Sequence, residues 1–554
     1  GTADTGTADT TVVDTGTADT GTTDTGSAVV DRFAQAVADF NAGLFTVAMG
    51  EFQSIEADFA GSEYELLSQV YEGRCEFELG QFAVAIAVFE DFRATFPGST
   101  SMPTVDYWEG RAQFELAAYP AALSFFQASL AGDPAGPFAD GAMFYEGRTH
   151  YELTEYATAV ETLGLLEVDF PSSTLLPNAA YYQGLSLFAL AEYATAHAAF
   201  AHILDYPASI FTDDAWYWMG RCDFELLGYA AALTEFETAA GLSDGSVAAG
   251  IAYYTGRTQY ELLDYATAAV TLHDAWSLYP TSIYVDNAMY YAGLALYNDG
   301  NPTGAKTEFL HLTMTFPNTS NYWDDAEYWY GRCDFALANY PAAITSFETV
   351  AGMPASNVVD AATYYAGRSQ YENGAYGNAV TELALVRTSY PASLYIDNAE
   401  YYEGRSYYAL ADYNGAITAL ARVLAYPTSA YLDDARYWTG RSYYSLVNYP
   451  TAITWFDQTI ATPGATVADQ AQYYKGRAYY AQSDYNNAIT QLRLVETNYP
   501  TSVYIDNSLY YIGRAYARLG DCVTARAVLL DMQTRFATST YTSRLATYLP
   551  GQGC

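Results

Sequence analysis

The sequence predicts an all-α solenoid of about 14 helical hairpins stacked on one another. The first observation is a motif of two aromatic residues, one variable residue, Gly and Arg, as in YWEGR, FYEGR, YYTGR and YYKGR. Its glycine recurs with a mean spacing of about 36.7 residues, a period typical of stacked repeats. The second observation is that apolar residues within each period lie three or four apart, as on one face of a helix. The repeat glycines are Gly73, Gly110, Gly147, Gly184, Gly220, Gly256, Gly293, Gly331, Gly367, Gly404, Gly440, Gly476 and Gly513.

One unit, residues 398–433, illustrates the predicted hairpin. The first apolar stripe consists of Ala399, Tyr402, Ser406 and Leu410, and the second of Ala416, Ile417, Leu420, Val423 and Leu424. The letters ADY between the stripes predict a short turn, and YP ends the second helix because proline cannot continue it. Asp or Asn directly before the next helix, as in LDDARYW, predicts an N-terminal cap. Neither face of such a hairpin is covered without a neighbour, which predicts stacking.

The two ends of the chain differ from the repeated middle, so we expect three regions. Residues 1–28 form a Thr/Asp/Gly tail that repeats in fives and carries no basic residue, a composition typical of disordered linkers. Residues 29–540 form the solenoid, of which 29–60 are a degenerate first hairpin. Residues 541–554 form a capping helix and a C-terminal tail.

The five cysteines fall into two groups. Cys75, Cys222 and Cys333 each follow a Gly-Arg pair, where other units have Ala, Thr or Ser, so we expect small buried side chains. The capping helix should run antiparallel to the helix that begins near Cys522, and its end would then return close to that residue. This arrangement predicts a Cys522–Cys554 disulfide, which fits an oxidising compartment.

A longer period of about 110 residues is superimposed on the hairpin period. Trp occupies the aromatic pair in every third unit, at Trp108, Trp218, Trp329 and Trp438. The segments YPTSIYVDNAMYY, YPASLYIDNAEYY and YPTSVYIDNSLYY follow one another at spacings of 111 and 109 residues. One interpretation is amplification of a three-hairpin block. Another, compatible with the first, is a lattice or fibre that presents every third hairpin to the same kind of neighbour.

The unit resembles the tetratricopeptide repeat (TPR), in particular the longer form of bacterial-envelope proteins, such as outer-membrane assembly and Tol-Pal-associated lipoproteins. The matching residues in one unit are Gly404, Tyr407, Asp412, Tyr413, Ala416 and Pro427. The resemblance covers about residues 30–548 and implies a right-handed solenoid with a concave groove. The chain departs from the family in one respect, because its fixed aromatic residue precedes the Gly by two positions rather than four.

An arginine follows most of the repeat glycines. These arginines are Arg74, Arg111, Arg148, Arg221, Arg257, Arg332, Arg368, Arg405, Arg441, Arg477 and Arg514. Considered alone, the row predicts an internal ladder in which each Arg pairs with an Asp or Glu between stacked hairpins. The family resemblance implies another role, because there the residue after the Gly lines the concave groove. The row would then be flanked by Phe224, Tyr260, Tyr371, Tyr408 and Tyr444, and would suit an extended acidic peptide or a glycan stacked on aromatic rings.

Composition and motifs argue against several functions. The chain has 23 Lys and Arg against 64 Asp and Glu, a formal net charge of -41, which repels nucleic acid and anionic lipid. It contains no run of 18 or more apolar residues, so we expect no membrane span. The five histidines lack metal-ligand spacing, and no phosphate-binding loop or nucleophile elbow is present. We therefore expect no enzyme, no metal and no cofactor; helix capping rather than calcium explains paired acids such as Asp213 and Asp214.

The tail offers sites for covalent sugars. Threonine-rich tracts of this kind are commonly O-glycosylated. The candidate O-glycosylation sites are Thr2, Thr5, Thr7, Thr10, Thr15, Thr17, Thr20, Thr22 and Thr25. Asn318 begins an Asn-Thr-Ser sequon and is the candidate N-glycosylation site.

Two hypotheses of function follow. The first is a non-enzymatic extracellular structural protein that self-assembles head-to-tail into a fibre. Its tail, which spans about 90 Å when extended, would be ordered in the groove of a neighbouring copy, by O-glycans, or by both. The second is a surface-anchored TPR scaffold that binds envelope proteins or glycans through its groove, with the tail as a flexible tether. Both place the chain outside the cell or at its surface, because Thr-rich linkers follow export signals, and the second allows a lipid anchor upstream of Gly1.

Overall fold

The computed structural model describes residues 25–541 except 208, 243, 244, 246 and 318, and this part of the chain consists of 28 α-helices without a strand. The helices fall into two compact units, and the chain passes from the first to the second between Ser282 and Ile283. The first unit contains α1 (Thr25–Asn41), α2 (Phe45–Asp58), α3 (Glu63–Glu78), α4 (Phe82–Thr95), α5 (Met102–Glu115), α6 (Tyr119–Gly132), α7 (Ala139–Glu152), α8 (Tyr156–Asp169), α9 (Leu176–Ala189), α10 (Tyr193–Ile203), α11 (Thr212–Glu225), α12 (Tyr229–Leu242), α13 (Ala248–Glu261) and α14 (Tyr265–Leu278). The second unit contains α15 (Val285–Asn298), α16 (Pro302–Thr315), α17 (Trp323–Ala336), α18 (Tyr340–Ala351), α19 (Val359–Glu372), α20 (Tyr376–Ser389), α21 (Ile396–Ala409), α22 (Tyr413–Val423), α23 (Leu432–Ser445), α24 (Tyr449–Ile460), α25 (Ala468–Ala481), α26 (Tyr485–Asn498), α27 (Ile505–Arg518) and α28 (Cys522–Arg535).

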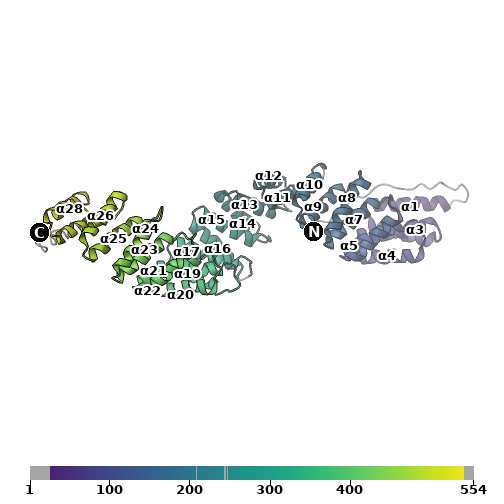
Figure 1. Cartoon of the computed structure of the whole chain (residues 1–554). Helices are drawn as coiled ribbons and strands as arrows, with labels where there is room; N and C mark the ends of the chain where they lie inside the picture. Colours follow the sequence, from purple (N-terminus) through teal and green to yellow (C-terminus); the bar gives the residue numbers. More distant parts are fainter. Residues whose placement is uncertain (1–24, 208, 243–244, 246, 318, 542–554) are drawn as a thin grey trace. The chain divides into compact units, whose positions relative to one another are not determined.

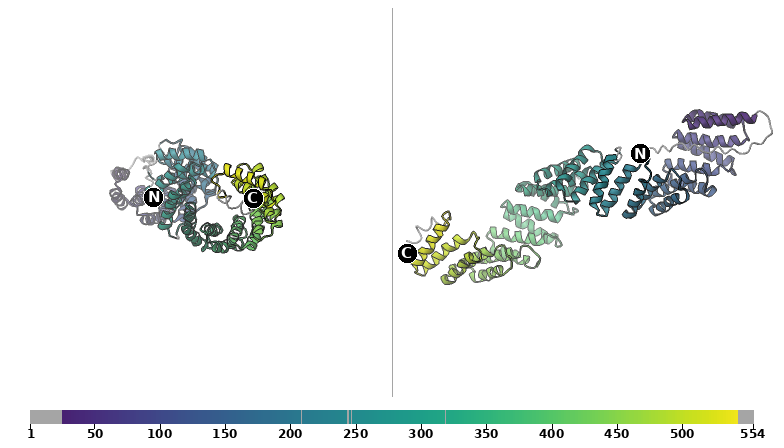
Figure 2. Two further views of the ribbon diagram at one scale, coloured as in Figure 1. Left: turned by 90° about the vertical axis from the view of Figure 1, so that its left-hand side faces the viewer. Right: turned by 90° about the horizontal axis from the view of Figure 1, so that it is seen from above.

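Each odd-numbered helix, here called an A helix, forms a hairpin with the even-numbered B helix that follows it (Figure 1). Within each unit, consecutive helices pack side by side in chain order (Figures 1 and 2). This arrangement confirms the all-α solenoid expected from the sequence. Among the described residues, no helix combines the length and the apolar character needed to cross a bilayer.

The repeat glycines lie where the two helices of a hairpin cross. A Cβ atom added at Gly404 in α21 would lie 2.7 Å from Cγ of Leu420 in α22. At every repeat glycine the nearest atom would be a Phe or Leu side-chain atom 16 residues later, at 2.3–2.9 Å. Only glycine allows so close an approach of the two helices. The residue after the glycine, which is the row arginine, therefore points away from its own B helix, toward the neighbouring hairpins.

A tight turn joins each A helix to its B helix. In the hairpin of α21 and α22, Ala411 has a positive φ of 60°, and Asp412 caps α22 by accepting a hydrogen bond from the Gly415 N–H at 2.9 Å. Glycine takes the positive-φ position in other hairpins, as at Gly374 and Gly520. The letters ADY thus form the turn expected from the sequence.

The expected caps at the A helices are wrong. Helix α23 begins at Leu432, and its N-cap residue Tyr431 makes no side-chain capping bond, so Asp433 lies inside the first turn. There its carboxylate accepts a hydrogen bond from the Thr466 N–H at 2.7 Å, in the loop before α25. The first-turn acids therefore complement the helix dipole, and they also link one hairpin to the next.

Candidate functional site

The row arginines are held between aromatic rings of neighbouring hairpins. In α21, the Arg405 guanidinium carbon lies 3.9 Å from the ring centroid of Trp438 in α23 and 5.7 Å from that of Tyr371 in α19. The guanidinium also donates a hydrogen bond to the Tyr401 hydroxyl, one turn earlier, at 2.8 Å. One arginine thus connects three consecutive A helices.

The same arrangement recurs along both units. Nine guanidinium carbons lie 3.6–4.9 Å from a ring on the next A helix. The pairs are Arg74–Trp108, Arg111–Tyr145, Arg148–Tyr182, Arg221–Tyr254, Arg332–Tyr365, Arg368–Tyr402, Arg405–Trp438, Arg441–Tyr474 and Arg477–Tyr511. Arg257 lies 5.7 Å from the Phe224 ring and Arg514 lies 5.3 Å from the Tyr480 ring. We call this set of stacked arginines and rings the arginine–aromatic ladder.

The aromatic residues proposed to flank the groove belong to the ladder as well. Tyr371 meets the edge of the Tyr402 ring at 5.2 Å, and Tyr408 meets the edge of Trp438 at 4.8 Å. The remaining contacts are Tyr444–Tyr474 at 5.8 Å, Phe224–Tyr254 at 5.6 Å and Tyr260–Tyr265 at 5.3 Å. These rings and the row arginines are half-buried. Their binding of a peptide or glycan stays a prediction.

The ladder differs from the internal ion-pair ladder considered from the sequence. Arg257 and Arg368 do pair with the carboxylates of Glu261 and Glu372, at 2.9 and 2.7 Å. In several later units the residue one turn after the arginine is Ala or Ser, so rings and phenol hydroxyls surround the guanidinium instead. Burial raises the pKa of Tyr401 to about 12, partly opposed by Arg405. The phenol therefore stays neutral and can accept the arginine hydrogen bond.

Some arginines outside the row neutralise buried acids. Arg93 in α4 pairs with Asp106 at 2.7 Å and Glu109 at 2.6 Å in α5, and these two side chains are 7% and 1% exposed. In the second unit, Arg422 in α22 pairs with Glu400 at 3.2 Å. The Gly-Arg motif contains only the row arginines, so it does not predict these ion pairs.

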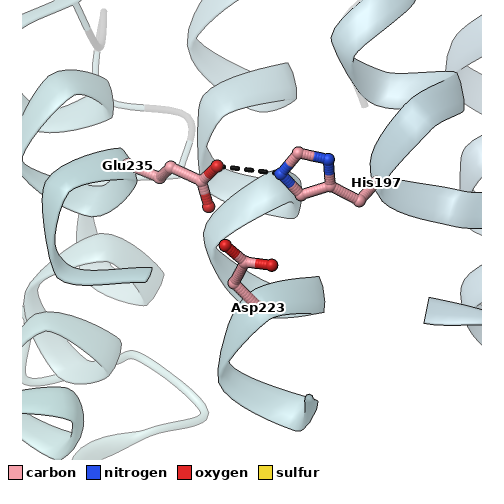
Figure 3. Close-up of side chains that lie close together, drawn as sticks. All are labelled: His197, Asp223 and Glu235. Carbon is pink, nitrogen blue, oxygen red and sulfur yellow. Dashed lines mark hydrogen bonds and ion pairs between the residues drawn. The ribbon is translucent and has the colours of Figure 1, made fainter. Parts of the chain in front are cut away.

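The structure also brings together three side chains of types that bind metal ions, from positions well separated in the sequence. His197 on α10, Asp223 on α11 and Glu235 on α12 point toward one another (Figure 3), with their potential ligand atoms within 4.8 Å of one another. His197 Nε2 lies 2.9 Å from Glu235 Oε1, and this hydrogen bond raises the pKa of the imidazole despite its partial burial. The spacing of the histidines in sequence did not reveal the cluster, because its members come from three helices.

The remaining predicted positions fall partly outside the described residues. Cys75, Cys222 and Cys333 are free and buried, as expected, and burial raises each thiol pKa to about 12. Cys522 is disulfide-bonded, whereas Cys554 lies outside the described residues. Asn318 and the tail threonines before Thr25 also lie outside the described residues. Thr25 is the first residue of α1.

Family models identify the repeat. A model described as tetratricopeptide repeat matches residues 72–140 and 401–466, and a second model of that description matches residues 470–502. No curated protein matches the chain.

Several solved structures are similar at low sequence identity. The APC/C heterotetramer Cut9–Hcn1 is 12% identical over 87% of this chain and 95% of that chain, with a TM-score of 0.32. A tetratricopeptide repeat protein from Parabacteroides merdae is 12% identical over 49% of this chain and 99% of that chain, with a TM-score of 0.34. The C-terminal part of a TPR repeat-containing protein from Cytophaga hutchinsonii is 15% identical over 53% of this chain and 98% of that chain, with a TM-score of 0.35.

Proposed function

Because the chain is a tetratricopeptide repeat protein, we propose that it is a non-enzymatic scaffold that holds protein partners at regular steps along its hairpins. The matching family models describe a repeat, and stacked repeats of this kind form extended surfaces suited to protein–protein interaction. The observation that carries the regular spacing is a periodic set of exposed apolar side chains in the second unit.

These side chains are Ile283, Leu394 and Val503, which are 84%, 92% and 80% exposed. Each occupies the same place in the loop before an A helix, and successive members are 111 and 109 residues apart. The same place in the intervening hairpins carries small or polar residues, which are Asn321, Asn357, Ala430 and Thr466. Single exposed apolar residues are common on protein surfaces, but their recurrence at every third hairpin favours repeated contact with one kind of neighbour.

The loop around Leu394 is held in place. The next residue, Tyr395, stacks on Tyr364 of the preceding hairpin with 5.0 Å between ring centroids and 14° between ring planes. The Tyr395 N–H also donates a hydrogen bond to the Ser393 hydroxyl at 3.1 Å. A side chain presented on an ordered loop loses little further conformational freedom when it binds, which favours its use in an interface.

The finer proposal is that the neighbour is another copy of the chain, and that the copies assemble outside the cell into a fibre. Equivalent exposed positions at nearly equal steps in the second unit support this proposal, because contacts that repeat without closing generate filaments. The net charge of -41 opposes it, because copies of the chain repel one another. We therefore expect assembly to strengthen as added salt shortens the range of this repulsion.

Sedimentation velocity of the full chain tests the proposal. The chain is measured over a range of protein concentrations, at salt concentrations from about 20 to about 500 mM. We expect larger species at high salt, and their loss in the triple variant Ile283→Asp, Leu394→Asp and Val503→Asp. The matched control is Asn321→Asp, Asn357→Asp and Ala430→Asp, which adds the same charge in the intervening hairpins and should still assemble.

A wild-type chain that stays monomeric at every salt concentration would contradict self-assembly. Envelope proteins or glycans would then be the partners of the scaffold, as in the second hypothesis. Intact mass spectrometry of native material tests the proposed tail sugars separately, since each O-linked sugar adds a defined mass to residues 1–28.

A further inference from the structure

We propose that His197, Asp223 and Glu235 form a binding site for one divalent transition-metal ion of the Zn²⁺ class. The inference does not depend on the proposed function. One imidazole nitrogen and two carboxylates provide three ligands of the types that Zn²⁺ accepts, which leaves a fourth position for water. The imidazole disfavours Ca²⁺ and Mg²⁺, because these ions prefer oxygen ligands throughout.

The geometry lies within reach of coordination. Three helices, α10, α11 and α12, each supply one side chain, and all three side chains point into the same space (Figure 3). Their potential ligand atoms lie within 4.8 Å of one another. Ligands about 2 Å from a tetrahedral Zn²⁺ are about 3.3 Å apart, so small side-chain rotations would complete the site.

Burial and polarity support a ligand at this place. Glu235 is 8% exposed, and its Oε2 atom is buried without a hydrogen-bond partner, although a buried carboxylate oxygen normally has one. The His197 side chain is 29% exposed, which gives an ion access from solvent. A metal ion would satisfy the unpaired oxygen directly.

An equivalent place three hairpins later shows how the same fold pairs the corresponding acid with a permanent cation instead of a metal. Counting from the repeat glycines, Lys306 corresponds to His197, Asp334 to Asp223 and Ser346 to Glu235. There the Lys306 ammonium pairs with the Asp334 carboxylate at 2.6 Å, and the Glu327 carboxyl, whose pKa is raised by burial, forms a hydrogen bond with Ser346.

The His197 cluster holds two carboxylates and, unlike the place around Lys306, no permanent cation. With a charged imidazole its net charge is still negative, whereas a divalent ion with a neutral imidazole makes it neutral. In most of the other hairpins the residue corresponding to His197 is apolar, as in Ile344 and Ile417, and the exceptions are Lys306 and Arg526. A polar group at this position therefore has a specific role, and metal coordination accounts for all three side chains.

The test uses isothermal titration of the metal-free full chain with Zn²⁺. Excess Mg²⁺ is present to occupy weak sites among the many surface carboxylates. We expect one site with a dissociation constant on the order of micromolar or tighter. The double variant His197→Lys and Glu235→Ser copies the equivalent place and should fold, and it should bind Zn²⁺ at least about tenfold more weakly.

The matched control is His202→Lys. His202 also lies beside two carboxylates, those of Glu167 at 3.3 Å and Asp205 at 3.0 Å, but these two side chains are exposed, at 58% and 73%. This variant should keep the site, and Co²⁺ should give visible absorption bands with the wild type and the control but not with the double variant. Equal Zn²⁺ affinity and equal Co²⁺ spectra in the wild type and the folded double variant would overturn the proposal.

Discussion

At the residue scale, a row arginine acts through the shape of its guanidinium as well as its charge. Arg405 stacks on Trp438 and bonds Tyr401 at once, which a planar group with several N–H donors can do. A lysine keeps the charge but has neither the plane nor the fixed donors. The ladder therefore explains why arginine recurs at this position in a chain that contains only Lys306 and Lys475 as lysines.

Arg405→Lys should lower the free energy of unfolding by about 1–2 kcal/mol, because a partly buried cation–π contact and a hydrogen bond are lost. The control is Arg436→Lys in the next A helix, α23, where the arginine donates to the Thr462 hydroxyl at 3.2 Å outside the ladder. Thermal unfolding followed by circular dichroism measures both. Equal stability of the two variants would show that the row has no structural role and would favour its use in binding.

At the element scale, the repeat glycine sets how closely the two helices of a hairpin pack. Its contact with a Phe or Leu 16 residues later is present in every hairpin that has the glycine. The constant spacing in sequence therefore reflects a constant crossing point between helices.

Gly404→Ala should destabilise the second unit by about 1–3 kcal/mol, because the added Cβ would lie 2.7 Å from Leu420 Cγ and the helices must separate. Gly377→Ala is the control, since its Cβ would meet nothing within 4 Å and alanine favours a helix. Hydrogen exchange measured hairpin by hairpin reports the change. Unchanged protection around α21 and α22 in Gly404→Ala would contradict the close crossing.

The elements show where sequence reasoning succeeds and where it stops. Helices, turns and the glycine position follow from spacing, because every unit repeats the same local pattern. The expectation that an acid such as Asp433 caps its helix is wrong, because α23 already begins at Leu432, one residue before Asp433. The Asp433 carboxylate instead accepts a hydrogen bond from Thr466 of the next hairpin. The His197 cluster depends on contacts among three helices. Alignment of the units could have revealed it, since the corresponding residue is usually apolar.

At the scale of the whole molecule, charge and periodicity oppose each other. The acids outnumber the basic residues by 64 to 23, and the ladder keeps many of those basic residues engaged between hairpins. The surface left to a partner is therefore acidic, with exposed apolar side chains at every third hairpin of the second unit. A partner must match those side chains while tolerating or neutralising the surrounding charge.

The most direct measurement of this account is electron microscopy of the full chain at high salt, at a resolution that identifies the residues in contact between neighbours. We expect assemblies in which Ile283, Leu394 and Val503 make equivalent contacts with successive copies. Assemblies held together elsewhere, or isolated particles under all conditions, would contradict the proposal that every third hairpin carries the contact between copies.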